Sequence, residues 1–305
     1  MTSTGEDIPT AWSPLDRAAL DRLLAELRPK LHRYCARMTG SVIDGEDVLQ
    51  DAMIKAIEAL PTAGTVENPE GWVFRIAHTT ALDFIRRRTR HEAVHSDEDV
   101  TMIASPTPVQ DERSAVAASL RTFMRLPASQ RSSVILKDVL GYSIEEIAGI
   151  LDGATVASVK ATLHRGRERL RELTAEPEPP RAPALSENER VLLAGYIDRF
   201  NAHDFDAMRN MLADEVRLDL VAKARVKGRA EVSKYYGHYE KLKDWHFVLG
   251  AVDGRPAALA LDPEHLSAPP IYFVLLRWDG GRLIDIRDFR YARYAAEGAE
   301  FVICS

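Results

Sequence analysis

The feature that most constrains this chain is residues 126–170, which read LPASQRSSVILKDVLGYSIEEIAGILDGATVASVKATLHRGRERL. Two short amphipathic segments flank a tight break, and the second segment is rich in cations. Ser143 followed by Glu146 is the pattern of a capping box that starts a helix, and Thr155 is suited to cap the next helix. Two helices joined in this way are typical of a helix-turn-helix, whose second helix enters the major groove of DNA.

Charge is concentrated around this motif. Residues 113–173 hold ten Lys and Arg against six Asp and Glu, a local balance of +4, whereas the whole chain of 305 residues has a net charge of −6. The overall negative charge excludes a protein that coats nucleic acid by bulk electrostatics. DNA contact must therefore come from a local basic patch or depend on a partner.

The predicted second helix carries an apolar stripe that we expect to be buried, made of Val156, Val159, Leu163 and Leu170. Polar and cationic side chains lie beside this stripe and are the candidate DNA contacts: Thr155, Ser158, Lys160, Ala161, His164, Arg165 and Arg167. Bases would be read by the residues near the start of the helix, and the remaining cations would hold phosphates. A charged helix that simply faces solvent is the alternative.

An earlier helical block covers residues 15–90. Within it, residues 46–60 predict a helix whose buried face carries Leu49, Met53, Ala56, Ile57 and Leu60. Its opposite face is acidic, with Glu46, Asp47, Gln50 and Asp51. This face is either solvated or a docking surface for a partner protein.

The next predicted helix reads GWVFRIAHTTALDFIRRRTR, residues 71–90. Trp72, His78 and Thr79 are candidates for its outer face. Arg86, Arg87, Arg88 and Arg90 end the helix, where cations also stabilise the helix dipole. Four arginines near an aromatic helix fit phosphate contacts and stacking on exposed bases better than a cap alone.

Two segments separate the predicted domains. Residues 91–112 hold six carboxylates, no Lys or Arg, and two prolines, and they predict an acidic linker. Residues 174–186 hold four prolines and predict a stiff spacer. Residues 1–14 are expected to be a loose tail.

Residues 187–305 follow a different pattern. Two predicted helices, near 187–200 and 204–212, lead into segments with period-two alternation, and Asp279-Gly280-Gly281 predicts a hairpin turn. No acid–base pair can be identified from the spacing of titratable residues. A small-molecule pocket is one reading of this domain, with five aromatic candidates for its lining: Tyr235, Tyr236, Trp245, Tyr272 and Phe289. A docking module without any ligand is the other.

The two helical blocks resemble one known family. EDVLQDAMIKAIEAL, GWVFRIAHTTALDFIRRR, LPASQR, GYSIEEIA and VKATLHRGRERL, in this order, resemble the conserved motifs of extracytoplasmic-function sigma factors of the sigma-70 family. The resemblance implies that the first block binds core RNA polymerase through Asp47, Gln50 and Asp51. It also implies that Trp72, His78, Thr79 and the arginine run lie near the melted -10 element, and that the second block reads the -35 element. Thr79 departs from the Asn that the family commonly has, and the turn at 152–154 has one additional residue.

Residues 187–305 resemble the SnoaL-like cone on FNAHDFDAM, the helix start KGRAEV and the final hairpin. The expected fold is therefore multidomain: two all-α domains, the second a helix-turn-helix, followed by an α+β SnoaL-like cone with a curved antiparallel sheet. The resemblance implies a sigma factor that is not an enzyme and that its last domain regulates in cis. Two rivals are a ligand-responsive helix-turn-helix regulator and an isomerase or cyclase fused to a DNA-binding module.

The two cysteines, Cys35 and Cys304, are isolated and lack metal-ligand spacing. We expect no cofactor and no metal. We expect no membrane contact, because no apolar run approaches the roughly 18 residues of a span. These features predict a cytoplasmic protein. The resemblance implies core polymerase and promoter DNA as partners, and an unknown small ligand is a further candidate.

Overall fold

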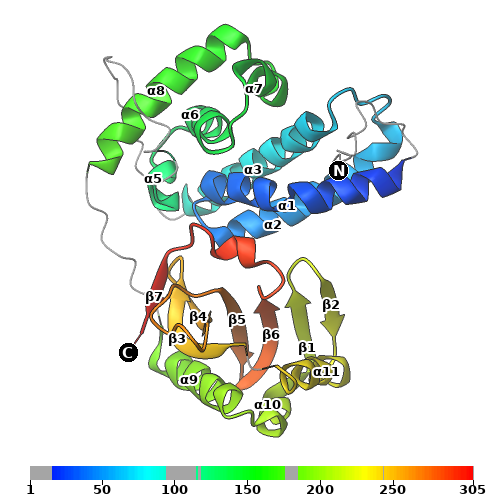
Figure 1. Ribbon diagram of the computed structural model, residues 1–305, viewed down its shortest axis with the longest axis vertical. Coiled ribbons are helices and arrows are strands. Elements are labelled where there is room, and N and C mark those ends of the chain that lie inside the picture. The colour runs from blue at the N-terminus through cyan, green and yellow to red at the C-terminus, as the bar shows by residue number, and fades with distance from the viewer. Residues whose placement is uncertain (1–15, 94–114, 116–117, 176–184, 243, 305) are drawn as a thin grey trace, which may run out of the picture. The chain divides into compact units, whose positions relative to one another are not determined.

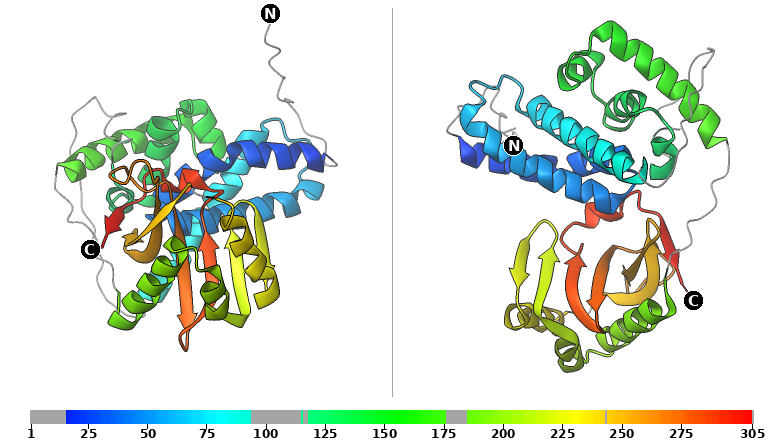
Figure 2. Two further views of the ribbon diagram at one scale, coloured as in Figure 1. Left: turned by 60° about the horizontal axis from the view of Figure 1, so that its bottom comes forward. Right: turned by 180° about the vertical axis from the view of Figure 1, so that it is seen from behind.

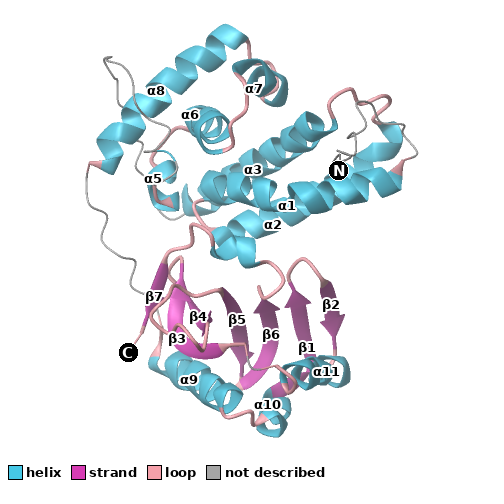
Figure 3. Ribbon diagram, in the orientation of Figure 1, coloured by secondary structure: helices cyan, strands magenta, loops and turns pink. Residues whose placement is uncertain are grey.

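The computed structural model describes residues 16–93, 115, 118–175, 185–242 and 244–304. The chain divides into two compact units, residues 1–177 and 178–305. Figure 1 shows the helices of the first unit and the sheet of the second, and Figure 3 shows that the described part of the first unit contains no strand. The fold class expected from the sequence is confirmed.

The first unit is built from helices with well-defined caps. Asp16 caps the first helix by accepting from the amide of Ala19 at 2.9 Å, and Ser41 caps the second. In chain order the elements are α1 Arg17–Thr39, α2 Val42–Ala59, the short 3-10 turn Leu60–Thr62, α3 Pro69–Ala93, α5 Leu120–Met124, α6 Ala128–Val134, a π-helical turn Ile135–Val139, α7 Ile144–Ile150 and α8 Val156–Thr174.

The helix-turn-helix is formed by α7 and α8. Its predicted caps are confirmed, because Ser143 and Glu146 form a capping box on α7 and Thr155 caps α8. Gly153 lies in the turn between α7 and α8 and has a φ of +72°, a conformation that favours glycine. The expectation that Val156 is buried is wrong. Val156 is the first residue of α8 and is 37% exposed, and the buried stripe of the helix begins at Val159.

One hydrophobic core runs through both helical blocks. Tyr34 of α1, Phe74 of α3 and Tyr142 before α7 form a chain of edge-to-face rings, with centroids 5.9 and 5.2 Å apart. Lys30 of α1 lies 4.1 Å from the Tyr142 ring centroid. The described residues of the two helical blocks, which the sequence separates by an acidic linker, therefore pack as one unit. The first three residues of that linker continue α3, and residues 94–112 lie outside the described residues.

The described part of the second unit contains a seven-stranded sheet and three α-helices. Its helices are α9 Glu187–Asn201, α10 Phe205–Met211 and α11 Arg229–Tyr239. Its strands are β1 Leu212–Leu220, β2 Ala224–Lys227, β3 His246–Val252, β4 Arg255–Leu261, β5 Tyr272–Asp279, β6 Arg282–Asp288 and β7 Phe301–Ile303, and a 3-10 turn spans Arg293–Ala296. The strand order is β2-β1-β6-β5-β4-β3-β7.

The sheet is mixed rather than wholly antiparallel. The predicted hairpin at 279–281 joins β5 and β6 as an antiparallel pair, whereas β1 pairs with β6 in parallel. A parallel pair is possible here because β1 and β6 are distant in sequence and no tight hairpin joins them. α9 packs against β3 and β4, and α11 packs against β1 and β2. Figure 2 shows these helices on one side of the sheet.

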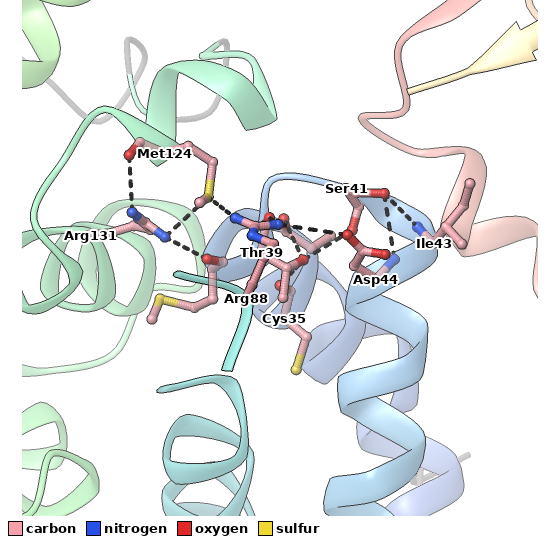
Figure 4. Close-up of polar contacts among 10 residues, drawn as sticks. Cys35, Thr39, Ser41, Ile43, Asp44, Arg88, Met124 and Arg131 are labelled. Atoms are coloured by element: carbon pink, nitrogen blue, oxygen red, sulfur yellow. Dashed lines mark hydrogen bonds and ion pairs between the residues drawn. The ribbon is translucent and has the colours of Figure 1, made fainter. Parts of the chain in front are cut away.

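A buried arginine joins the two helical blocks of the first unit. Arg131 of α6 is 4% exposed and donates to three main-chain carbonyls: Met38 at 2.5 Å, Leu126 at 2.9 Å and Met124 at 3.1 Å. Met38 belongs to α1, so this one guanidinium links α1 to the segment between α5 and α6. Figure 4 shows Met124 between Arg131 and Arg88, with both arginines directed at its sulfur.

Replacing this guanidinium should destabilise the first unit. Arg131→Met would leave buried carbonyl oxygens without a donor, and we expect the free energy of unfolding to fall by roughly 2–5 kcal/mol. Denaturant unfolding of the full chain, followed by helical circular dichroism, measures this change. Arg125→Met is the matched control, because Arg125 is exposed one residue before Leu126. A change under about 0.5 kcal/mol at Arg131 would contradict the structural role.

Candidate nucleic-acid and partner interfaces

The acidic face of α2 is partly as predicted. Asp47 and Asp51 are exposed and Gln50 is half-buried. Ile54, one turn after Gln50 and Asp51, is 45% exposed, so the surface combines carboxylates with an apolar side chain. We call Asp47, Gln50, Asp51 and Ile54 the α2 face. Sequence periodicity pointed to the carboxylates, and the exposed Ile54 was missed.

Glu46 does not belong to this face. It is 1% exposed and forms an ion pair with Arg28 of α1. The expectation that Glu46 lies on the outer, acidic face is therefore wrong. The reason is that α1 packs directly over the start of α2, and its Arg28 neutralises the carboxylate that this packing buries.

On α3 the predicted outer residues differ in exposure. Thr79 is exposed, and its hydroxyl donates to the carbonyl of Arg75 at 3.0 Å. Trp72 is half-buried and packs against the core. His78 is half-buried, with its Nδ1 2.7 Å from the Tyr34 hydroxyl. Burial, followed by the nearby charge of Arg86, lowers the pKa of His78 to about 4, so its imidazole is neutral at pH 7.

The arginine run at the end of α3 divides into two kinds of side chain. Arg86 and Arg87 are exposed. Arg88 is half-buried, donates to the carbonyl of Thr39 at 2.9 Å and lies 3.7 Å from the carboxylate of Asp44 (Figure 4). Arg90 is exposed as well, so Arg86, Arg87 and Arg90 are the accessible cations of the run, whereas Arg88 holds α3 against the start of α2.

On α8 most predicted contacts reach solvent. Six of the seven residues are exposed: Thr155, Ser158, Lys160, Ala161, His164 and Arg165. Arg167 differs, because it forms a two-pronged ion pair with Asp138, whose side chain has no exposed surface. Its Nε lies 2.9 Å from Asp138 Oδ2. Arg167 therefore stabilises the packing of α8 against the π-helical turn.

The candidate surfaces of α3 and α8 meet in one cavity of about 410 Å³. His78 and Leu82 line it from α3, and Ser158 and Thr162 line it from α8. Arg75 also crosses between the two blocks, donating to the carbonyl of Gly149 at 2.6 Å. The residues predicted to read two separate DNA elements thus lie beside each other in this unit.

The second unit holds a cavity of about 260 Å³ between α11, β1, β2 and the end of β6. Of the five predicted pocket residues, only Tyr235 lines it. Phe289 stacks on Phe273, with centroids 4.2 Å apart. Tyr236, Trp245 and Tyr272 lie in the aromatic core. The prediction that these four aromatic residues line the pocket is therefore wrong. Large rings instead fill the interior of this domain around Phe200, which lies against Tyr236 and Trp245.

Asp288 forms the polar end of the cavity. It has no exposed surface, and its Oδ2 accepts from the hydroxyls of Tyr239 at 2.8 Å and Tyr235 at 2.9 Å. Its Oδ1 accepts from the amide of Arg290 at 2.8 Å. Burial raises the pKa of the Asp288 carboxyl above its usual range, and these hydrogen bonds oppose that shift.

Among the described residues, no group of three or more His, Cys, Asp or Glu side chains is arranged to hold a metal ion. Within the same ranges, every helix is too short or too polar to cross a bilayer.

Three family models match the chain, each to a separate segment. Sigma-70 region 2 matches residues 23–91, and Sigma-70 region 4 matches residues 120–170. The SnoaL-like domain model matches residues 193–285. The order of the three matches is the order expected from the motifs.

Two sigma factors are similar to about half of this chain. The ECF RNA polymerase sigma factor SigE of Mycolicibacterium smegmatis is 34% identical over 170 residues, which cover 53% of this chain and 65% of that protein. SigM of Mycobacterium tuberculosis is 34% identical over 158 residues, which cover 52% of this chain and 78% of that protein.

A solved structure resembles the chain over most of its length. The extracytoplasmic function sigma factor SigJ of Mycobacterium tuberculosis covers 88% of this chain and 95% of its own at 19% identity, with a TM-score of 0.33. Membership rests on the sequence matches to both sigma regions and on the relatives at 34% identity: the chain belongs to the extracytoplasmic-function sigma factors of the sigma-70 family and carries a SnoaL-like domain.

Proposed function

We propose that this chain recruits core RNA polymerase through the α2 face and directs it to promoters with α3 and α8. It is not an enzyme in its own right, and it acts in the cytoplasm with the polymerase. The observation that carries the proposal is the succession of the two sigma regions along one chain. The two rivals, a ligand-responsive regulator and a fused isomerase or cyclase, do not account for region 2.

The α2 face supports the docking part of the proposal. Docking surfaces commonly combine a desolvated apolar anchor with a polar rim. Ile54 supplies the apolar side chain, and Asp47 and Asp51 supply exposed charge around it. A basic, partly apolar groove on the polymerase clamp is the complementary surface.

Reversing charge on the α2 face should weaken polymerase binding. We expect Asp51→Lys to reduce affinity for core polymerase by roughly tenfold or more, because like charges meet across the interface. Ile54→Ala should also reduce affinity, through lost apolar burial. Titration of labelled sigma factor with core polymerase measures both changes.

The control for this experiment is Glu26→Lys, which reverses an exposed carboxylate on α1 outside the α2 face. Its affinity should stay within about twofold of the wild-type value, as expected for a charge outside the contact. Equal binding by Asp51→Lys, Ile54→Ala and the wild type would refute this docking surface.

For the -35 element we propose a set of base-contacting residues from the exposed start of α8. Recognition helices contact base edges with their first turns. Thr155, Ser158, Ala161 and Arg165 lie on these turns, with Lys160 and His164 beside them. We add Val156, whose exposed methyl groups suit contact with a thymine methyl. Arg167 is left out because its guanidinium is occupied by Asp138.

Two arginines of α8 should behave differently when removed. Arg165→Ala should change the preferred -35 sequence at one position, costing about 1–3 kcal/mol at the cognate base. Arg171→Ala, further along the exposed helix, should weaken all promoters equally and reduce the salt slope by about one. Holoenzyme binding to single-base promoter variants at several salt concentrations separates these effects.

Arg167→Ala is the control in this series. It should lower stability without changing base preference, because it leaves a buried carboxylate unpaired. If Arg165→Ala and Arg171→Ala have the same effect on every promoter, the division between base and phosphate contacts is refuted.

For the -10 element we propose that Arg86 and Arg87 hold phosphates and that Trp72, His78 and Thr79 lie near unstacked bases. Arg88 contributes by orienting the end of α3. His78 is neutral at pH 7, so its contribution is stacking or hydrogen bonding rather than charge.

We further propose that the compact first unit is the resting form. The -10 and -35 elements lie about 25 base pairs apart by definition, or roughly 85 Å at 3.4 Å per pair. His78 and Ser158 line one cavity of about 410 Å³. Residues so close together cannot reach both elements at once, so α8 and α3 must separate before promoter binding.

The SnoaL-like domain is proposed to regulate this step in cis. Eleven residues lie between the last residue of α8, Thr174, and the cap of α9, Ser186. They span at most about 34 Å, at roughly 3.1 Å per residue in an extended polyproline conformation. A tether this short gives the second unit a high effective concentration beside the first unit, so even weak contacts between the two units are populated.

Removing the second unit should raise transcription. A chain ending after Ala175 keeps the whole core of the first unit, and we expect it to give more run-off transcript with core polymerase than the full chain. Adding residues 186–305 as a separate chain at equal concentration should not restore the lower level, because the tether is lost. Equal transcription by the full and shortened chains would refute regulation in cis.

A further inference from the structure

The junction between the two helical blocks contains a thioether between two cations. Met124 ends α5, and its sulfur lies 3.1 Å from Arg131 Nη1 of α6 and 3.9 Å from Arg88 Nη2 of α3 (Figure 4). A thioether is only a weak hydrogen-bond acceptor, whereas each guanidinium carries a full charge and five N–H donors. Two charged donors are therefore directed at an atom that accepts little from them.

Met124 differs in position from another methionine that contacts an arginine. The sulfur of Met53 lies 3.1 Å from Arg28 Nη1, but Met53 and Arg28 belong to α2 and α1 of the same block. Met124 belongs to the second block, and its contact with Arg88 reaches the first block. A chemical change at the Met124 sulfur therefore acts on the packing of one block against the other.

The Met124 side chain is held in place but is not sealed from solvent. A Cβ atom added at Gly40 would overlap Met124 Cγ, so the backbone after α1 packs closely against this side chain. Met124 is half-buried, whereas Met38 of α1 has no exposed surface. A small solute can therefore reach Met124 more readily than Met38.

A peroxide converts such a sulfur into a polar acceptor. The sulfur attacks one oxygen of hydrogen peroxide, an S–O bond forms and the O–O bond breaks. The proton on the transferred oxygen passes to the leaving hydroxide, which departs as water, so the sulfur is oxidised by two electrons and the peroxide is reduced. The 3.9 Å between the sulfur and Arg88 Nη2 exceeds the roughly 2.7–3.2 Å of an N–H···O hydrogen bond, which leaves space for one oxygen atom between them.

We propose that Met124 is a site of oxidation by peroxides, and that its sulfoxide holds the two helical blocks together more tightly than the thioether does. The sulfoxide oxygen accepts from the guanidiniums of Arg88 and Arg131. Methionine sulfoxide reductases reverse the modification. Its consequence for transcription rests on the proposed resting form: α3 and α8 separate less readily in the oxidised chain.

The modification is tested on the full-length protein treated with hydrogen peroxide. Mass spectrometry of its peptides should show the gain of one oxygen at Met124 at least roughly tenfold faster than at Met38, because Met38 has no exposed surface.

The effect on the junction is tested by thermal unfolding followed by helical circular dichroism. Met124→Leu nearly conserves the side-chain volume but has no sulfur. The shift in melting temperature that peroxide causes should be more positive in the wild type than in Met124→Leu by about 2–4 °C, as expected for hydrogen bonds to charged groups. Oxidation at Met53 and at the cysteines is common to both proteins and cancels in this comparison.

Met211→Leu is the matched control, because Met211 is also half-buried but belongs to the second unit. Its peroxide-induced shift should stay within about 1 °C of the wild-type shift. If Met124→Leu does not melt cooperatively, Met124→Gln takes its place, since it also lacks a sulfur.

Three results would overturn the proposal: oxidation of Met124 no faster than that of Met38, equal shifts in the wild type and the Met124 variant, or a less positive shift in the wild type. These measurements use neither polymerase nor promoter DNA. A failure of this inference is therefore distinguishable from a failure of the proposed function.

Discussion

The continuous core of the first unit is the constraint on which its functional surfaces depend. Tyr34, Phe74 and Tyr142 connect α1, α3 and the start of the helix-turn-helix, and Arg131 adds three hydrogen bonds to buried carbonyls beside them. Rings and a guanidinium can hold two sequence blocks together because their contacts are specific in direction. The same packing brings candidate DNA-reading residues of α3 and α8 to one cavity, and this is the ground on which we propose that the compact arrangement is a resting form.

Buried charge has a different role in each unit. In the first unit three buried ionic side chains each have partners that explain their burial: Glu46 has Arg28, Asp138 has Arg167 and Arg131 has three carbonyls. These pairs fix one element against the next and remove their members from the surface. In the second unit Asp288 accepts from two tyrosines and a backbone amide, but it does so at the end of a cavity. The contrast separates structural polar groups from the candidate site.

The predictions made from local sequence patterns were the most reliable. Ser143 with Glu146, Thr155, the turn at Gly153 and the hairpin at 279–281 were all predicted and are confirmed, because each depends on residues within a few positions of one another. Predictions for single side chains were weaker. Glu46 and Val156 were assigned to the wrong environment, and four of five pocket aromatics lie in the core.

The sequence by itself determined the order of the domains, the position of the helix-turn-helix and the family, since motif spacing and helix caps are local properties. Only the tertiary structure decided which charged residues are available. The partners of Arg88, Arg167 and Glu46 lie 18 to 49 residues away, a distance over which periodicity carries no information. Tertiary packing likewise made a cavity from β1, β2, α11 and the end of β6, because residues so far apart in sequence meet only when the sheet and helices close around them.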